Sequence, residues 1–170
     1  VKWGDPSDPP EADTVCGIGN RKNGYFESAL RTDGIAPYPG SLRVLDLLRE
    51  AGTPVAVVSS SKNADEVLRT AGIRDRFGVV VDGVVAERED LASKPAPDMF
   101  LAAARMLQVE PDRAAAVEDA LSGVRSAAAG GFGLVIGVDR GVGADALRAA
   151  GADAVVDDLA DLVETGSHRS

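Results

Sequence analysis

The chain has 170 residues, of which 45% are apolar and 26% are charged, a composition typical of one globular domain. Its 27 acidic side chains outnumber 18 lysines and arginines, which gives a net charge of −9 and an isoelectric point near 4.6. This balance argues against a surface that binds nucleic acid or an anionic membrane, and no apolar run reaches the ~18 residues that a membrane span needs.

The sequence has one cysteine and one histidine, which limits the disulfides, metal sites and catalytic triads that it could form. Cys16 has no partner for an intrachain disulfide, which favours a reducing compartment, and we expect a cytoplasmic protein. The single histidine, His168, stands near the end of the chain. A metal site built on several histidines is therefore excluded, and a Ser-His-Asp triad is disfavoured.

The predicted elements fall into two stretches that differ in pattern. No strong element is expected before residue 20, and apolar positions at helical spacing then predict helices over 20–32 and 41–50. From residue 54 onward, short apolar runs alternate with helical patterns, which predicts an α/β fold with a doubly wound parallel sheet. Strands are expected at 54–58, 79–81, 114–117, 134–138 and 154–156, and helices at 63–71, 98–107, 121–129, 144–149 and 159–163.

Polar residues follow the predicted strands at the edge where open parallel sheets bind ligands. Hydroxyls and free N–H groups at a helix start suit a phosphate, a lysine suits a phosphoryl charge, and adjacent carboxylates suit Mg²⁺. Together they predict a phosphate and Mg²⁺ site. The candidates are Ser59, Ser60, Ser61, Lys62 and Asn63 after the first strand, Lys94 after the second, and Glu118 and Asp119 after the third.

Each of these features also has a purely structural interpretation. The serines could cap a helix, Lys94 could be a charge on a surface loop, and the paired carboxylates could sit at a helix N-terminus. The functional interpretation is preferred because all three features fall on one edge of the sheet.

Several segments resemble the haloacid dehalogenase-like superfamily of phosphatases and phosphomutases, and its β-phosphoglucomutase-like subfamily in particular. RKN at residues 21–23, followed by YPG at 38–40, resembles the end of that subfamily's helical cap. The resemblance covers roughly residues 17–163. The segments that carry it most specifically are VAVVSSSKN, SKPAPDMFLAAA and AAVEDALSGVRSAAAGGF, which begin at residues 55, 93 and 115.

The resemblance implies a role for each candidate in phosphoryl transfer on small sugar phosphates. Ser59 would bind the transferring group, and Lys94 would neutralise it. Asp119 would bind Mg²⁺ directly, with Glu118 as a direct or an outer ligand. The phosphate that is not transferred would lie against Ser61, Lys62 and Asn63, and Ser60 would also contact the substrate. Lys22 with Arg21 would reach the substrate from the cap.

The resemblance also implies a division of the chain into four parts. Residues 1–16 would be an irregular linker, 17–38 the C-terminal part of a helical cap, 39–164 the core and 165–170 a tail. The family's nucleophile is the first Asp of a D-x-D-G segment that ends an N-terminal strand, and no such segment occurs in the 170 residues.

We therefore expect the core to lack its first strand, which would lie between the strands at 54–58 and 114–117. The resulting slot is expected to be filled by a segment outside this sequence or by another chain. By itself the chain is expected to be inactive and to bind Mg²⁺ weakly, because the nucleophile and part of the metal site are missing.

Three functions follow from these observations. The first is a phosphatase or mutase that forms an aspartyl-phosphate. The second is a non-catalytic scaffold or fragment that binds a phosphorylated ligand or a protein partner. The third is an unrelated doubly wound module that accepts a phosphoryl group. The third ranks last because such a module carries paired acids after its first strand, whereas Glu118 and Asp119 follow the third strand of this chain.

Overall fold

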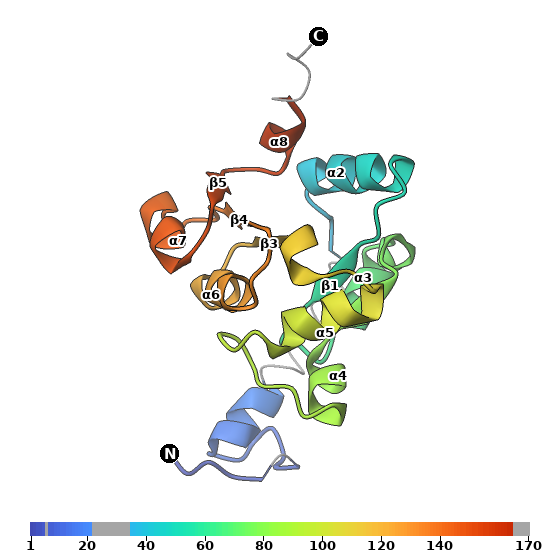
Figure 1. The fold of residues 1–170 in the computed structure, drawn as a ribbon. Coiled ribbons are helices and arrows are strands. Elements are labelled where there is room, and N and C mark those ends of the chain that lie inside the picture. Colours follow the sequence, from blue (N-terminus) through green and yellow to red (C-terminus); the bar gives the residue numbers. More distant parts are fainter. Residues whose placement is uncertain (6, 22–34, 165–170) are drawn as a thin grey trace.

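The computed structural model describes residues 1–5, 7–21 and 35–164 (Figure 1). None of the described helices is both long and apolar enough to cross a membrane. Strands alternate with helices from residue 56 onward. The elements are α2 (Pro39–Glu50), β1 (Ala56–Val58), α3 (Ala64–Thr70), η1 (Arg74–Arg76), β2 (Val79–Val81), α4 (Gly83–Arg88), α5 (Asp98–Leu107), η2 (Pro111–Arg113), β3 (Ala115–Glu118), α6 (Leu121–Ala129), β4 (Leu134–Val138), α7 (Ala144–Ala150), β5 (Ala154–Val156) and α8 (Ala160–Glu164).

The strands and helices predicted between residues 41 and 163 are all present, each within two residues of its expected ends. The α-helix α4 and the short 3-10 helices η1 and η2 were not predicted. The helix α4 has a clear start. Its N-cap is Asp82, whose carboxylate accepts hydrogen bonds from the N–H groups of Val84 and Val85. Such a cap satisfies donors that a helix start leaves free, and it starts a helix in a segment too short to show a helical period.

The expectation of no strong element before residue 20 is wrong, because the chain is helical over residues 15–21. Thr14 begins this helix, since its hydroxyl accepts a hydrogen bond from the Gly17 N–H at 3.0 Å and donates one to Asp8 at 2.6 Å. Most of the helix predicted over 20–32 lies outside the described residues.

The strands form two parallel groups. β1 pairs with β2, with Val57 opposite Val80, and β3, β4 and β5 pair in that order, with Val117 opposite Ile136. No ladder joins β1 to β3 within the described part of the chain. This gap between β1 and β3 lies where the family resemblance implies a further strand, and Val117 on β3 is 44% exposed.

The helix α5 packs against both groups. Met99, Ala102 and Ala103 belong to a buried cluster on the β1–β2 group, whereas Phe100 belongs to the larger cluster around β3, β4, α6 and α7. Figure 1 shows α5 in front of β1, with α6 and α7 beside β3–β5. One helix therefore contributes to two cores, and this sharing holds the two strand groups on either side of the gap.

Candidate functional site

Lys94 connects the two strand groups at the carboxyl ends of β1 and β3. Its ammonium donates a hydrogen bond to the Val58 carbonyl at 3.2 Å and forms an ion pair with Glu118. The two charged side chains are only 11% and 10% exposed. A buried lysine that bridges two strand ends is no ordinary surface-loop charge, because such burial is unfavourable unless the charge is paired.

Glu118 is held by several contacts at once. One carboxylate oxygen pairs with Lys94, and the other accepts hydrogen bonds from the N–H groups of Asp119 and Ala120 at 3.2 and 3.3 Å. Gly123 makes room for this arrangement, because a Cβ atom there would lie 2.1 Å from the Glu118 carboxyl carbon. Glu118 thus positions Lys94 and the start of α6.

Asp119, in contrast, is exposed, and no described residue donates a hydrogen bond to its carboxylate. The described residues contain no group of three metal-binding side chains. One free carboxylate at the end of a strand nevertheless fits Mg²⁺, which takes one or two carboxylates together with water and phosphate oxygens. Asp119 is therefore the metal-ligand candidate, and further ligands have to come from elsewhere.

The turn after β1 is organised by its serine hydroxyls. The Ser59 hydroxyl accepts a hydrogen bond from the Ser61 N–H, and the Ser61 hydroxyl accepts one from the Asn63 N–H, both at 3.2 Å. No side chain caps α3 directly. The Gly83 N–H donates to the Ser61 carbonyl at 3.1 Å, and a Cβ at Gly83 would lie 2.8 Å from the Ser60 carbonyl. The start of α4 therefore supports this turn from behind.

The expected substrate-binding cations are less closely placed. Lys62 pairs with Glu87 of α4, and both side chains are largely exposed, at 58% and 70%. Arg21 is exposed and makes no ion pair with the strand-end residues that the structure describes. Lys22 lies outside the described residues. The structure thus brings Lys94 and Glu118 together, with Asp119 next in the chain, and places Lys62 on a neighbouring surface.

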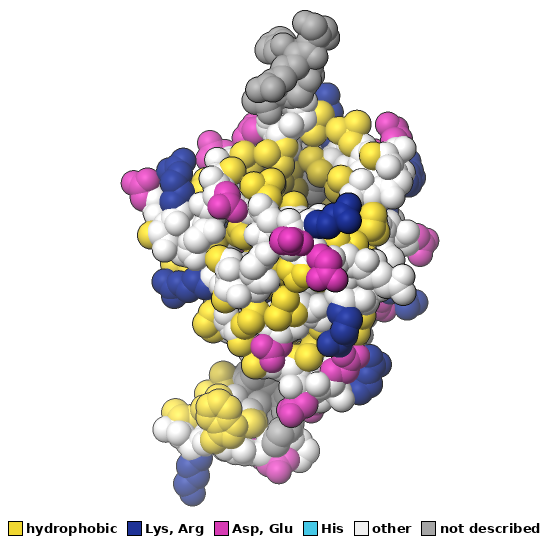
Figure 2. Space-filling view, in the orientation of Figure 1, with side chains coloured by type: hydrophobic (Ala, Val, Ile, Leu, Met, Phe, Trp, Pro, Cys, Tyr) yellow, Lys and Arg dark blue, Asp and Glu magenta, His cyan; other side chains and the backbone are white. Residues whose placement is uncertain are grey.

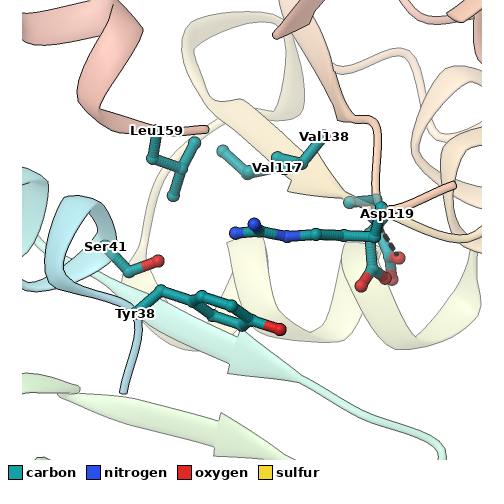
Figure 3. A pocket seen from close by; sticks show the side chains of 8 residues that line it. Tyr38, Ser41, Val117, Asp119, Val138 and Leu159 are labelled. Carbon is teal, nitrogen blue, oxygen red and sulfur yellow. Dashed lines mark hydrogen bonds between the residues drawn. The ribbon is translucent and has the colours of Figure 1, made fainter. Parts of the chain in front are cut away.

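A cavity of about 300 Å³ opens beside Asp119. Figure 3 shows Tyr38 and Ser41 on one side of it, with Val117, Val138 and Leu159 on the other. In Figure 2, hydrophobic side chains are exposed over the middle of the molecule. The cavity is lined by Tyr38, Ser41, Val117, Glu118, Asp119, Val138, Arg140 and Leu159.

Arg140 and Tyr38 line this cavity without having been assigned a role from the sequence. The Arg140 guanidinium stacks over the Tyr38 ring at 3.9 Å from its centroid and lies 3.7 Å from an oxygen of Asp158. The only signal in the sequence was their position, one after β4 and the other before α2. Their contact joins residues about a hundred positions apart, which local patterns do not reveal.

Asp139, which precedes Arg140, shapes the loop after β4. Backbone N–H groups of Gly143 and Gly141 donate hydrogen bonds to its carboxylate and hold the pKa of Asp139 below its usual value. The Asp139 carboxylate therefore stabilises this loop, whereas the Asp119 carboxylate accepts no hydrogen bond from a described residue.

Comparisons with known proteins extend the resemblance to most of the chain. A model of the haloacid dehalogenase-like hydrolase family matches residues 7–131. The β-phosphoglucomutase of Mycobacterium bovis is 52% identical over 164 residues, which cover 94% of this chain and 62% of that protein. The trehalose-phosphate phosphatase of Mycobacterium leprae is 34% identical over 138 residues, which cover 78% of this chain and 30% of that protein. The chain thus spans less than two thirds of the length of these relatives.

A solved structure supports the same relationship. CbbY from Rhodobacter sphaeroides, as a variant in complex with xylulose-(1,5)bisphosphate, matches with a TM-score of 0.74 and 29% identity. The match covers 95% of this chain and 70% of that chain. The two chains therefore share one α/β fold with parallel strands.

Proposed function

The chain belongs to the haloacid dehalogenase-like hydrolase family and its β-phosphoglucomutase-like subfamily, and on this premise we propose that it serves Mg²⁺-dependent phosphoryl transfer on small sugar phosphates. The attacking group would be an aspartate from outside the 170 residues, because they contain no D-x-D-G segment. The chain would supply the groups that bind and neutralise the phosphoryl group.

The position of Lys94 is the observation that carries this proposal. Its ammonium lies between the ends of β1 and β3, held by the Val58 carbonyl and by Glu118. A charge fixed at this point would stabilise a phosphoryl group that is transferred between the two strands, and such positioning accounts for most of the catalysis of phosphoryl transfer.

Ser59 and Asp119 would complete the transfer site. The Ser59 hydroxyl, at the end of β1, would donate a hydrogen bond to the transferring group. The Asp119 carboxylate would hold Mg²⁺, which when bound would supply further positive charge to the phosphoryl oxygens. Glu118 would keep Lys94 in place. It would be an outer ligand of the metal, because both of its carboxylate oxygens already have hydrogen-bond partners.

A second phosphate on the substrate would lie along the turn after β1. Lys62 would have to leave Glu87 to reach it, which is a small cost because the exposed pair contributes only about 0–1 kcal/mol. The neighbouring polar groups Ser60, Ser61 and Asn63 would share this phosphate, and Lys22 with Arg21 would reach the substrate from the cap.

The gap between β1 and β3 would be filled by a parallel apolar strand that brings the nucleophile. Val117 is partly exposed along this gap. Buried backbone groups without a partner cost about 1–3 kcal/mol each, so an open gap between two strands is unfavourable. We propose that the strand comes from a segment outside the 170 residues or from another chain.

An activity assay tests the proposal. The protein should be prepared with the completing strand, either joined to this sequence or added as a separate chain, and assayed with Mg²⁺ on a panel of hexose phosphates. We expect turnover with the strand and none without it. Lys94→Ala should lower kcat by about 10²–10³-fold, the usual loss for one group that stabilises a transition state.

Lys62→Ala is the matched control for the charge. It should raise KM and leave kcat near the wild-type value, because binding that is equal in the ground and transition states does not change kcat. A wild-type kcat in Lys94→Ala would contradict the proposed transfer site. Binding of phosphorylated ligands without turnover, in the strand-completed protein, would favour the non-catalytic scaffold.

The products distinguish the two reactions found among the relatives. Release of inorganic phosphate identifies a phosphatase, and conversion of one hexose phosphate into its isomer identifies a mutase. We also propose a cytoplasmic location, which the single cysteine and the small phosphorylated substrate support.

A further inference from the structure

Phe100 lies directly beneath the lysine on which the proposed function depends. It belongs to α5, is only 6% exposed, and its ring lies under the Lys94 ammonium at 5.0 Å from nitrogen to ring centroid. An ammonium over the face of an aromatic ring is attracted by the negative charge of that face. The attraction is stronger here than at a surface, because the Lys94 side chain is nearly buried.

The ammonium of Lys94 has three N–H donors, and its surroundings offer three different partners. Glu118 and the Val58 carbonyl accept hydrogen bonds, and the ring of Phe100 closes a third side. The first two partners fix the ammonium between the strand ends. The ring closes the side toward the core, so the charge stays between the strand ends, where a phosphoryl group would bind.

Phe100 also contacts a second aromatic ring in the core. Its ring meets the ring of Phe132 edge to face, with centroids 5.6 Å apart and an angle of 73° between the planes. Both rings belong to the core around β3 and α6. Of these two rings, the one whose face lies under the Lys94 ammonium is that of Phe100, so Phe132 offers a control for the packing of the core outside the site.

We propose that Phe100 is a positioning residue that sets the place of the Lys94 ammonium through the face of its ring. The inference rests on the proposed function only for its effect on rate. The geometric part stands by itself, since it concerns contacts within the chain, and can be tested without substrate.

The geometric test uses NMR on the 170-residue chain with ¹³C-labelled lysine. The sequence has four lysines, so each ε-carbon signal can be resolved, and Lys94→Arg identifies the one of interest. Protons held over a ring face are shifted upfield. We expect such a shift for Lys94 in the wild type and in Phe132→Leu, and its loss in Phe100→Leu. An unchanged Lys94 signal in Phe100→Leu would overturn the proposal.

The rate test uses the strand-completed enzyme. Phe100→Leu should lower kcat roughly tenfold with little change in KM, in keeping with the strength of a desolvated cation–π contact. Phe132→Leu is the matched control, since it removes the other ring of the same pair from the same core. An equal fall of kcat in both variants would assign the effect to general packing and overturn the proposal. Phe100→Met, which keeps more of the buried volume, replaces Phe100→Leu if that variant does not fold.

These outcomes separate the inference from the proposed function. Loss of the Lys94 shift in Phe100→Leu, in a strand-completed protein that turns over no phosphorylated substrate, would support the positioning contact and contradict the function. Turnover by a wild-type protein whose Lys94 signal is not shifted upfield would support the function and contradict the positioning contact.

Discussion

The two strand groups border the same gap but differ in how they are stabilised. β4, the middle strand of the β3–β5 group, has four consecutive buried residues, and the cluster around it contains Phe100, Val124 and Leu147. The two strands of the β1–β2 group are mostly half-buried. On that side, ion pairs are frequent on the surface, among them Asp65 with Arg74.

The groups are connected by packing and polar contacts in place of a shared ladder. α5 contributes to both cores, Lys94 joins the ends of β1 and β3, and the buried Ser126 hydroxyl of α6 donates to the Ala96 carbonyl at 2.6 Å. The two strand groups are therefore held beside each other by contacts from outside the strands.

Among the changes considered, removing the Lys94 side chain should weaken the connection between the two strand groups most. Lys94→Ala is expected to lower the free energy of unfolding by about 3–5 kcal/mol, because Glu118 would remain buried without its partner. Lys62→Ala, which removes a lysine from an exposed pair within the β1–β2 side, should cost about 0–1 kcal/mol. Urea unfolding measures both. Adding Glu118→Gln to Lys94→Ala should recover part of the loss, and equal losses in the two single variants would contradict the bridge.

A methyl group added at Gly123 of α6 should also weaken the connection between the strand groups, because it would displace Glu118 from Lys94. Gly123→Ala would place its Cβ against the Glu118 carboxyl group and is expected to cost about 1–3 kcal/mol, although alanine normally favours a helix. Gly78→Ala at the start of β2 is the control, because its nearest neighbour lies 4.0 Å away. A more stable Gly123→Ala protein would show that Glu118 is free to move.

The hydroxyl contact between α6 and the loop before α5 should have a moderate effect. Ser126→Ala leaves the Ala96 carbonyl without its donor, which we expect to cost about 1–2 kcal/mol. Hydrogen exchange should then rise in α6 and in the loop at residues 93–97, and stay unchanged in β5. Faster exchange throughout the chain would instead indicate a general loss of stability.

The loss of ion pairs in acid on the β1–β2 side should be the smallest of these effects. Arg74, followed by Arg69, lowers the pKa of Asp65 below 3.8, and Arg76 lowers that of Asp46. A lowered pKa in the folded state stabilises the protein above the ordinary value, and this contribution is lost as the pH falls through the lowered one. Asp65→Asn should therefore flatten the pH dependence of stability below pH ~4. An unchanged acid unfolding curve would contradict the pairing.

The strands, the helices and the edge that carries the site could be predicted from the sequence, because each depends on neighbouring residues. Runs such as residues 134–138 match strands, and the spacing at 98–107 matches a helix to the residue. Lys94, Glu118 and Asp119 could be selected because parallel strands end on one edge. The starts of two helices, at Thr14 and Asp82, depend on single side-chain hydrogen bonds and were missed.

The sequence by itself determined the family, the alternation of elements and the side chains that could bind a phosphate. Only the tertiary structure decided which of those side chains contact and position one another. Lys94 meets Glu118 and Val58 across 24 and 36 residues, and Met99 and Phe100 face different cores although they are adjacent in the chain. Such contacts depend on how α5 packs between two strand groups, and no local pattern of residues encodes that packing.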